Sequence, residues 1–188
     1  MTEYLHRIKI QQARDCQLDF VTLAYHEAGH AVAGFHYGCP FKKISLLSYD
    51  LVPEYPGKSV GGIVDFDDSR EPSDDIQARE WVRNAIIATY CGPIAERKVR
   101  GRYNHGGAKH DLQKIIMAGE ALASDLDQEL MNVLDQVAEE AEVFLNTPQV
   151  WKEVEAVATA LLKVAIFKNG VLTAAEVEKT IQAAGGPA

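Results

Sequence analysis

The chain has 188 residues, of which 47% are hydrophobic, and its formal net charge is −8. A chain of this length can bury its own core. The acidic balance, with no run of Lys or Arg longer than two, argues against nucleic acid as a partner. Neither an apolar signal segment nor a run of about 18 apolar residues occurs, so we expect a soluble, cytoplasmic protein with no membrane partner.

The first expected elements are a helix and two strands. Asp19 can cap a helix that begins near Phe20 and ends before Gly38 and Pro40. Its expected buried stripe recurs at helical spacing and consists of Leu23, Ala24, Ala28, Ala31 and Phe35. Two apolar runs follow, at 44–47 and 60–66, and predict two strands with a Pro/Gly segment between them.

The rest of the chain is predicted to be mostly helical. Ser73 can cap a long helix through Tyr90, with a bend at Gly92–Pro93 because proline removes a donor and clashes with the preceding turn. A glycine-rich loop at 101–107 precedes three helices, expected at Ala108–Ala123, Asp125–Leu145 and Pro148–Phe167. After a turn at 170–173, Thr173 and Glu176 form a capping box for a last short helix. The expected fold class is α+β, predominantly helical, with a small β-sheet and a C-terminal helical bundle.

One motif inside the first helix carries chemistry. His26, Glu27 and His30 form an H-E-x-x-H sequence, in which the two histidines lie one helical turn apart and can reach a single metal ion. Glu27 lies beside such an ion, where its carboxylate can take a proton from a metal-bound water. The alternative is two ordinary, partly buried histidines with a solvated Glu27. Gly29 argues against it, because a helix-interior glycine costs about 1 kcal/mol and indicates a close approach to the backbone.

A catalytic zinc needs a third protein ligand and an open position. Asp111 follows a glycine-rich loop at the start of a predicted helix, and Glu96 on the preceding helix is the other carboxylate to consider. On these grounds alone, Asp111 is better explained as a first-turn acid that complements the helix dipole.

Several segments together resemble the peptidase domain of the FtsH family of AAA zinc metalloproteases, over nearly all of the chain. The segment 26–32 resembles the family's H-E-A-G-H-A sequence, 92–96 its G-G-R-x-A-E helix, and 107–112 its G-A-x-x-D-L sequence. The resemblance implies one domain over 1–188, with a zinc-site half at 1–124 and a C-terminal helical part at 125–188. It also implies that Asp111 is the third ligand of one Zn²⁺ per chain, beside His26 and His30. Finally, it implies that a polypeptide substrate pairs with an edge strand at Ser59, Val60, Gly61, Gly62, Ile63 and Val64.

The chain departs from that family in four respects. It has no G-x-x-x-x-G-K-[ST] phosphate loop and no membrane span, Pro93 replaces an arginine, and His105–Gly106 replaces two threonines. The sequence therefore predicts a stand-alone zinc peptidase that cleaves unfolded or flexible segments without ATP.

Several alternatives to that reading stay open. The chain could be a specific regulatory protease of the repressor-cleaving type, a non-catalytic zinc adaptor, or an accessory subunit of a separate ATPase. A homo-oligomer is also left open as a partner state.

Overall fold

The computed structural model describes residues 20–47, 61–66, 74–104, 108–167 and 170–187. Residues 20–36 form a helix that carries H-E-x-x-H and is called the motif helix below. It is followed by the elements β1 Phe41–Leu47, β2 Gly61–Phe66, α2 Asp75–Arg100, α3 Lys109–Leu126, α4 Leu130–Asn146, α5 Pro148–Phe167, β3 Val171–Thr173 and α6 Ala174–Ala183. The prediction of a predominantly helical α+β fold is confirmed.

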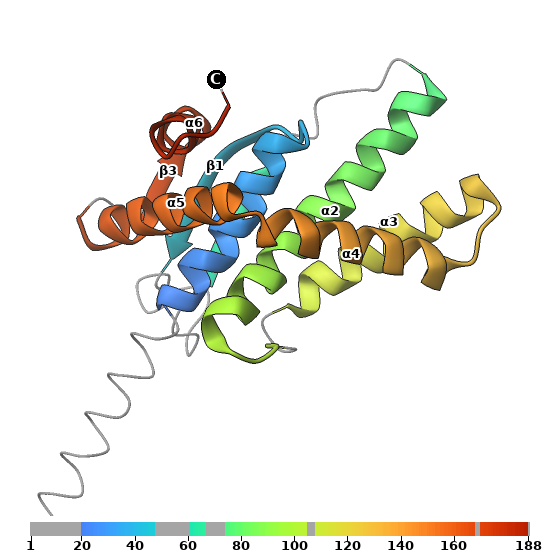
Figure 1. Cartoon of the computed structure of the whole chain (residues 1–188), viewed down its shortest axis with the longest axis horizontal. Coiled ribbons are helices and arrows are strands. Elements are labelled where there is room, and N and C mark those ends of the chain that lie inside the picture. The colour runs from blue at the N-terminus through green and yellow to red at the C-terminus, as the bar shows by residue number, and fades with distance from the viewer. Residues whose placement is uncertain (1–19, 48–60, 67–73, 105–107, 168–169, 188) are drawn as a thin grey trace, which may run out of the picture.

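The motif helix, blue in Figure 1, lies between the sheet with α5 and α6 on one side and the helices α2, α3 and α4 on the other. Its small residues Ala24, Ala28 and Ala31 are fully buried, whereas the predicted stripe residues Leu23 and Phe35 are only partly buried. Short side chains on this face let neighbouring helices come close to its backbone. Asp19, the expected cap, lies outside the described residues.

The sheet is antiparallel and has three strands in the order β2-β1-β3. The buried Ile44 of β1 pairs with Val64 of β2 on one side and with Leu172 of β3 on the other. The two predicted strands are confirmed, and among the described residues β2 lies at an edge of the sheet. The segment 170–173 was expected to be a turn, and this prediction was wrong, because Val171–Thr173 form the strand β3. Three residues are too few for an alternating pattern to be recognised, and β3 exists because it pairs with the distant β1.

The long helix α2 is continuous across Pro93. A proline inside a helix costs about 3 kcal/mol. Here the surrounding turns, from Ile86 to Glu96, are largely buried, and their packing holds the helix together. The cap is Asp74, whose side chain accepts a 2.8 Å hydrogen bond from the Gln77 N–H, and the predicted cap Ser73 lies outside the described residues.

The boundary between α3 and α4 differs from its prediction. α3 continues to Leu126 and ends at Asp127, which adopts the left-handed conformation with φ 52°, so the helix expected from Asp125 starts at Leu130 instead. Aspartate adopts this conformation more readily than most residues, and an Asp in a polar stretch gives no marked breaker signal. The helix at Pro148–Phe167 and the Thr173–Glu176 capping box are confirmed.

Two contacts fix α5 against the motif helix. Tyr25 stacks on Trp151 with ring centroids 5.7 Å apart, and His36 Nε2 lies 2.6 Å from the fully buried carboxylate of Glu153. Within the described residues, no helix is long and apolar enough to cross a membrane.

Gly29 marks the closest approach of the motif helix to α2. A Cβ built on Gly29 would lie 2.5 Å from the Cys91 carbonyl oxygen and 2.8 Å from the Ala95 Cβ, both of which belong to a rigid helix. The expectation that something approaches the backbone at Gly29 is therefore confirmed.

We predict that Gly29→Ala lowers the free energy of unfolding by about 2 kcal/mol or more, because overpacking against backbone outweighs the gain in helix propensity. Chemical denaturation measures this. The matched control is Gly119→Ala, also within a helix, where the new Cβ would meet only the movable side chains of Leu130 and Leu134. That change should cost less than about 1 kcal/mol. Equal effects of the two substitutions would contradict the interpretation.

Candidate metal centre

Three side chains from two helices meet at one point. His26 and His30 project from adjacent turns of the motif helix, and Asp111 projects from the first turn of α3. His26 Nε2 lies 3.0 Å from His30 Nε2 and 3.0 Å from Asp111 Oδ2, and His30 Nε2 lies 3.6 Å from Asp111 Oδ2. The two histidines are each 5% exposed. This group could hold a metal ion.

The spacing of these atoms fits a tetrahedral ion. Bonds of about 2.0 to 2.2 Å to a tetrahedral zinc place neighbouring ligand atoms about 3.3 to 3.5 Å apart. The three observed separations, 3.0, 3.0 and 3.6 Å, lie around this value. Three ligands would leave the fourth position open, as in catalytic zinc sites.

The far nitrogens of both rings have acceptor partners. His30 Nδ1 donates to the Ala88 carbonyl oxygen at 2.9 Å, and His26 Nδ1 donates to Glu96 Oε2 at 3.0 Å. Because a carbonyl and a carboxylate can only accept, the Nδ1 atoms carry protons, and the Nε2 atoms are the ones that face the candidate metal position. Ligating histidines commonly have such an acceptor behind them.

The same residues can also satisfy one another as ion pairs. Burial lowers the pKa of His26, but hydrogen bonds to Asp111 and Glu96 outweigh it and raise the pKa to about 10. Burial likewise opposes ionisation of Asp111, yet the hydrogen bonds to His26 and His30 hold the pKa of its carboxyl well below the usual range. A positive charge between the ligands, whether a proton or a metal ion, therefore stabilises the cluster.

Gly92 provides the room for the second histidine. A Cβ on Gly92 would overlap the His30 ring at its Cε1 and Nε2 atoms. Any side chain at this position of α2 would push His30 away from His26 and Asp111. Gly92 thus sets the position of a candidate ligand, the His30 ring.

Glu27 is buried and has one unsatisfied oxygen. It is 3% exposed, and its Oε2 atom has no hydrogen-bond partner within the described residues. Burial raises the pKa of its carboxyl, an effect that the neighbouring His26 and His30 partly offset. A buried, unpartnered carboxylate oxygen is costly, and a water or ligand bound within hydrogen-bond distance would satisfy it.

Glu96 has a role that the sequence left undecided. It was the rival to Asp111 as third ligand, but its Oε2 atom accepts from the far nitrogen of His26, so it lies behind that ring. Its Oε1 atom accepts from Arg100 Nη1 at 3.1 Å and from Asn104 Nδ2 at 2.8 Å. Arg100, four residues after Glu96, was one available sequence signal, and Gly92, a glycine inside a helix as Gly29 is, was another. Asn104 gave no signal.

The structure describes only part of the predicted substrate strand. Gly61, Gly62, Ile63 and Val64 lie on the edge strand β2, and Ser59 and Val60 lie outside the described residues.

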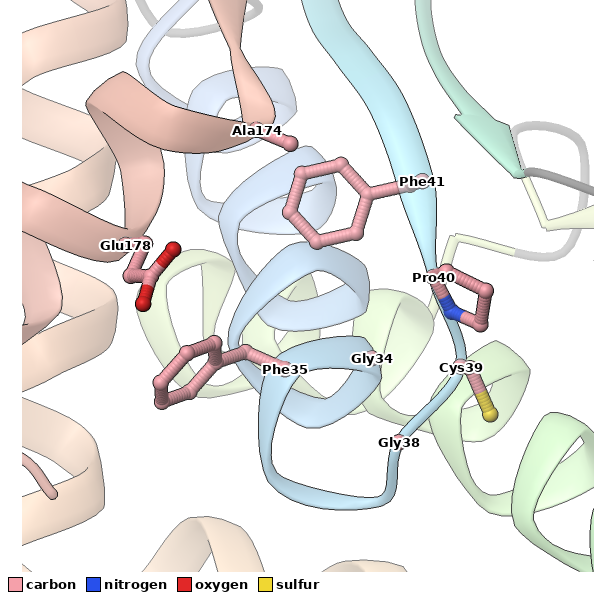
Figure 2. A pocket seen from close by; sticks show the side chains of 8 residues that line it. All are labelled: Gly34, Phe35, Gly38, Cys39, Pro40, Phe41, Ala174 and Glu178. Atoms are coloured by element: carbon pink, nitrogen blue, oxygen red, sulfur yellow. The ribbon is translucent and has the colours of Figure 1, made fainter. Parts of the chain in front are cut away.

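A separate hollow of about 250 Å³ lies at the C-terminal end of the motif helix, between β1 and α6 (Figure 2). Phe35, Phe41 and Pro40 give it an apolar lining, and Glu178 of α6 lies at its edge. None of the three candidate ligands lines it, so this hollow is distinct from the metal centre.

No family model matches the chain, and no curated protein matches it with significance. The candidate centre is therefore defined by its own residues, namely His26, His30 and Asp111 as a possible metal-binding group with Glu27 beside them.

Proposed function

We propose that this chain is a zinc peptidase that hydrolyses peptide bonds in unfolded or flexible polypeptide segments without ATP. The observation that carries the proposal is Glu27, a buried carboxylate with an unsatisfied oxygen next to a two-histidine, one-aspartate group. A purely structural zinc site has four protein ligands and no use for such a residue.

The donor set favours zinc and is compatible with other metals. Two imidazole nitrogens and one carboxylate oxygen suit zinc, and they also suit cobalt, nickel or ferrous iron. Glu27 favours hydrolysis over oxygen chemistry, because a carboxylate that does not ligate the metal can act on a water molecule. When bound, zinc would lower the pKa of a water to about 7 and polarise a carbonyl oxygen.

The protein's own groups supply the remaining steps. His26 and His30 are held with their Nε2 lone pairs inward by Glu96 and the Ala88 carbonyl. Glu27 takes the proton of the attacking water and passes it to the leaving amine. The raised pKa of Glu27 suits this task, because a general base transfers protons best when its pKa approaches the working pH.

We further propose that substrate adds as a strand to the outer edge of β2, along Gly61–Val64. An edge strand presents unpaired backbone groups, and extended peptides commonly pair with such edges. Hydrogen bonds to the substrate backbone do not depend on the substrate's side chains. This mode of binding therefore suits a peptidase that acts on unfolded segments of varied sequence.

We predict that purified wild-type protein binds about one zinc per chain and that Asp111→Ala reduces the affinity at least a hundredfold, because it removes one of three ligands. Metal analysis and competition with a chromophoric chelator measure this. His110→Ala is the matched control, because His110 is the neighbouring residue, is exposed and lies outside the ligand group. Zinc binding that survives Asp111→Ala and disappears with Glu96→Ala would make Glu96 the third ligand instead.

We predict that Glu27→Gln lowers peptide hydrolysis by about a hundredfold or more while zinc binding stays near that of the wild type, because the change removes only basicity. Casein and a quenched unfolded peptide are suitable substrates, each with and without a chelator.

The same variant has a second readout in stability. Burial raises the pKa of Glu27 in the folded state above the pKa that it has in the unfolded chain. As the pH rises above the pKa of the unfolded state, ionisation of Glu27 therefore lowers the free energy of unfolding. Metal-free Glu27→Gln should therefore be more stable than the wild type at neutral pH, with little difference at acid pH.

Unchanged hydrolysis in this variant would assign the activity elsewhere and favour the zinc adaptor.

A further inference from the structure

The carboxylate of Glu96 is held from both sides. Glu96 is 4% exposed, and its Oε2 atom accepts a hydrogen bond from His26 Nδ1. Its Oε1 atom accepts hydrogen bonds from Asn104 Nδ2 and Arg100 Nη1. A carboxylate fixed at both oxygens cannot rotate, so it sets the plane of the His26 ring.

The two donors come from different places. Arg100 is one helical turn after Glu96 on α2 itself, and its side chain is partly exposed. Asn104 lies beyond the end of α2, which Gly101 terminates with φ 76°, in the left-handed conformation that glycine adopts without strain. The Asn104 side chain therefore reaches back to α2 from the connection that leads to α3.

Asn104 also contacts the start of α3. Its backbone carbonyl accepts a 3.0 Å hydrogen bond from the N–H of Ala108, the N-cap residue of α3, which has no side-chain cap bond. Asp111 follows three residues later, in the first turn. Asn104 is thus connected to two of the three candidate ligands. Its side chain bonds Glu96, which bonds His26, and its backbone carbonyl bonds the first residue of the α3 terminus that carries Asp111.

We infer that Asn104 is a positioning residue of the metal centre, which holds Glu96 against His26 and couples this orientation to the place of Asp111. This inference rests on the metal-binding part of the proposed function. Asn104 touches neither the metal position nor the reacting atoms; it acts through Glu96. Beside the charged Arg100, the neutral Asn104 amide donates a second hydrogen bond to Oε1 without adding a further positive charge.

The test is Asn104→Asp, which keeps the size and the backbone bond to Ala108 and replaces the donor with an acceptor facing Glu96. We expect zinc affinity to fall by up to about tenfold, less than the roughly 10- to 100-fold typical of losing a partner bonded directly to a ligand, because Asn104 acts one step further out, through Glu96. The visible absorption of the cobalt-substituted protein should also change, because the His26 ring shifts relative to the metal. Asn104→Ala removes the donor without adding charge and serves if the first variant fails to fold.

Asn146→Asp is the matched control, because it makes the same chemical change at the end of α4, where Asn146 accepts from Lys98. Its zinc affinity and cobalt spectrum should equal those of the wild type. If the Asn104 variants lose thermal stability without metal but keep the wild-type affinity and spectrum, Asn104 is merely structural and the inference is wrong.

The outcomes separate this inference from the proposed function. A wild-type chain that binds zinc and hydrolyses no peptide refutes the peptidase and leaves the role of Asn104 intact. A wild-type chain that binds neither zinc nor cobalt overturns the metal centre and this inference together.

Discussion

The close packing of the motif helix against α2 is the constraint on which the site depends. Gly29 and Gly92 add no side chain of their own to the contact between the two helices, and the His30 ring occupies the space that a Cβ on Gly92 would fill. Only at this separation does the Ala88 carbonyl of α2 reach His30, and Glu96 of α2 reach His26. Helix packing and ligand orientation are therefore one feature of the fold.

The position of Asp111 is set less directly. It depends on where α3 begins, and α3 is reached through a reversal at the end of α2 that Gly101 makes possible. Two helices that pack together can hold two imidazoles rigidly, whereas a ligand from a third element requires a fixed connection. The hydrogen bonds of Asn104 to Glu96 and Ala108 provide such a fixed point.

The sequence predicted the elements whose patterns are local. The motif helix follows from its apolar spacing, α5 from the Pro at its start, and the α6 capping box from a Glu three positions after Thr173; the structure confirms all three. It failed where the deciding contact is distant or where a polar residue adopts an uncommon conformation, as for β3 and for Asp127. In the site, the H-E-x-x-H spacing alone was enough to bring His26 and His30 together. Asp111 needed the resemblance, because a first-turn acid has several ordinary explanations.

Asn104 and Gly92 show why the remainder of the site was not predicted. Neither residue type is a preferred metal ligand, and each acts through a neighbour that is itself only identified once the helices are packed. Glu27 is the opposite case. Its proposed role as a base follows from the motif, but the destabilisation caused by burying its carboxylate does not. The fold keeps this carboxylate buried and partly unsatisfied, which local structure alone would not favour. The burial that destabilises the fold also raises the pKa of this carboxyl. A loss of stability of this kind is expected where a group serves for its reactivity.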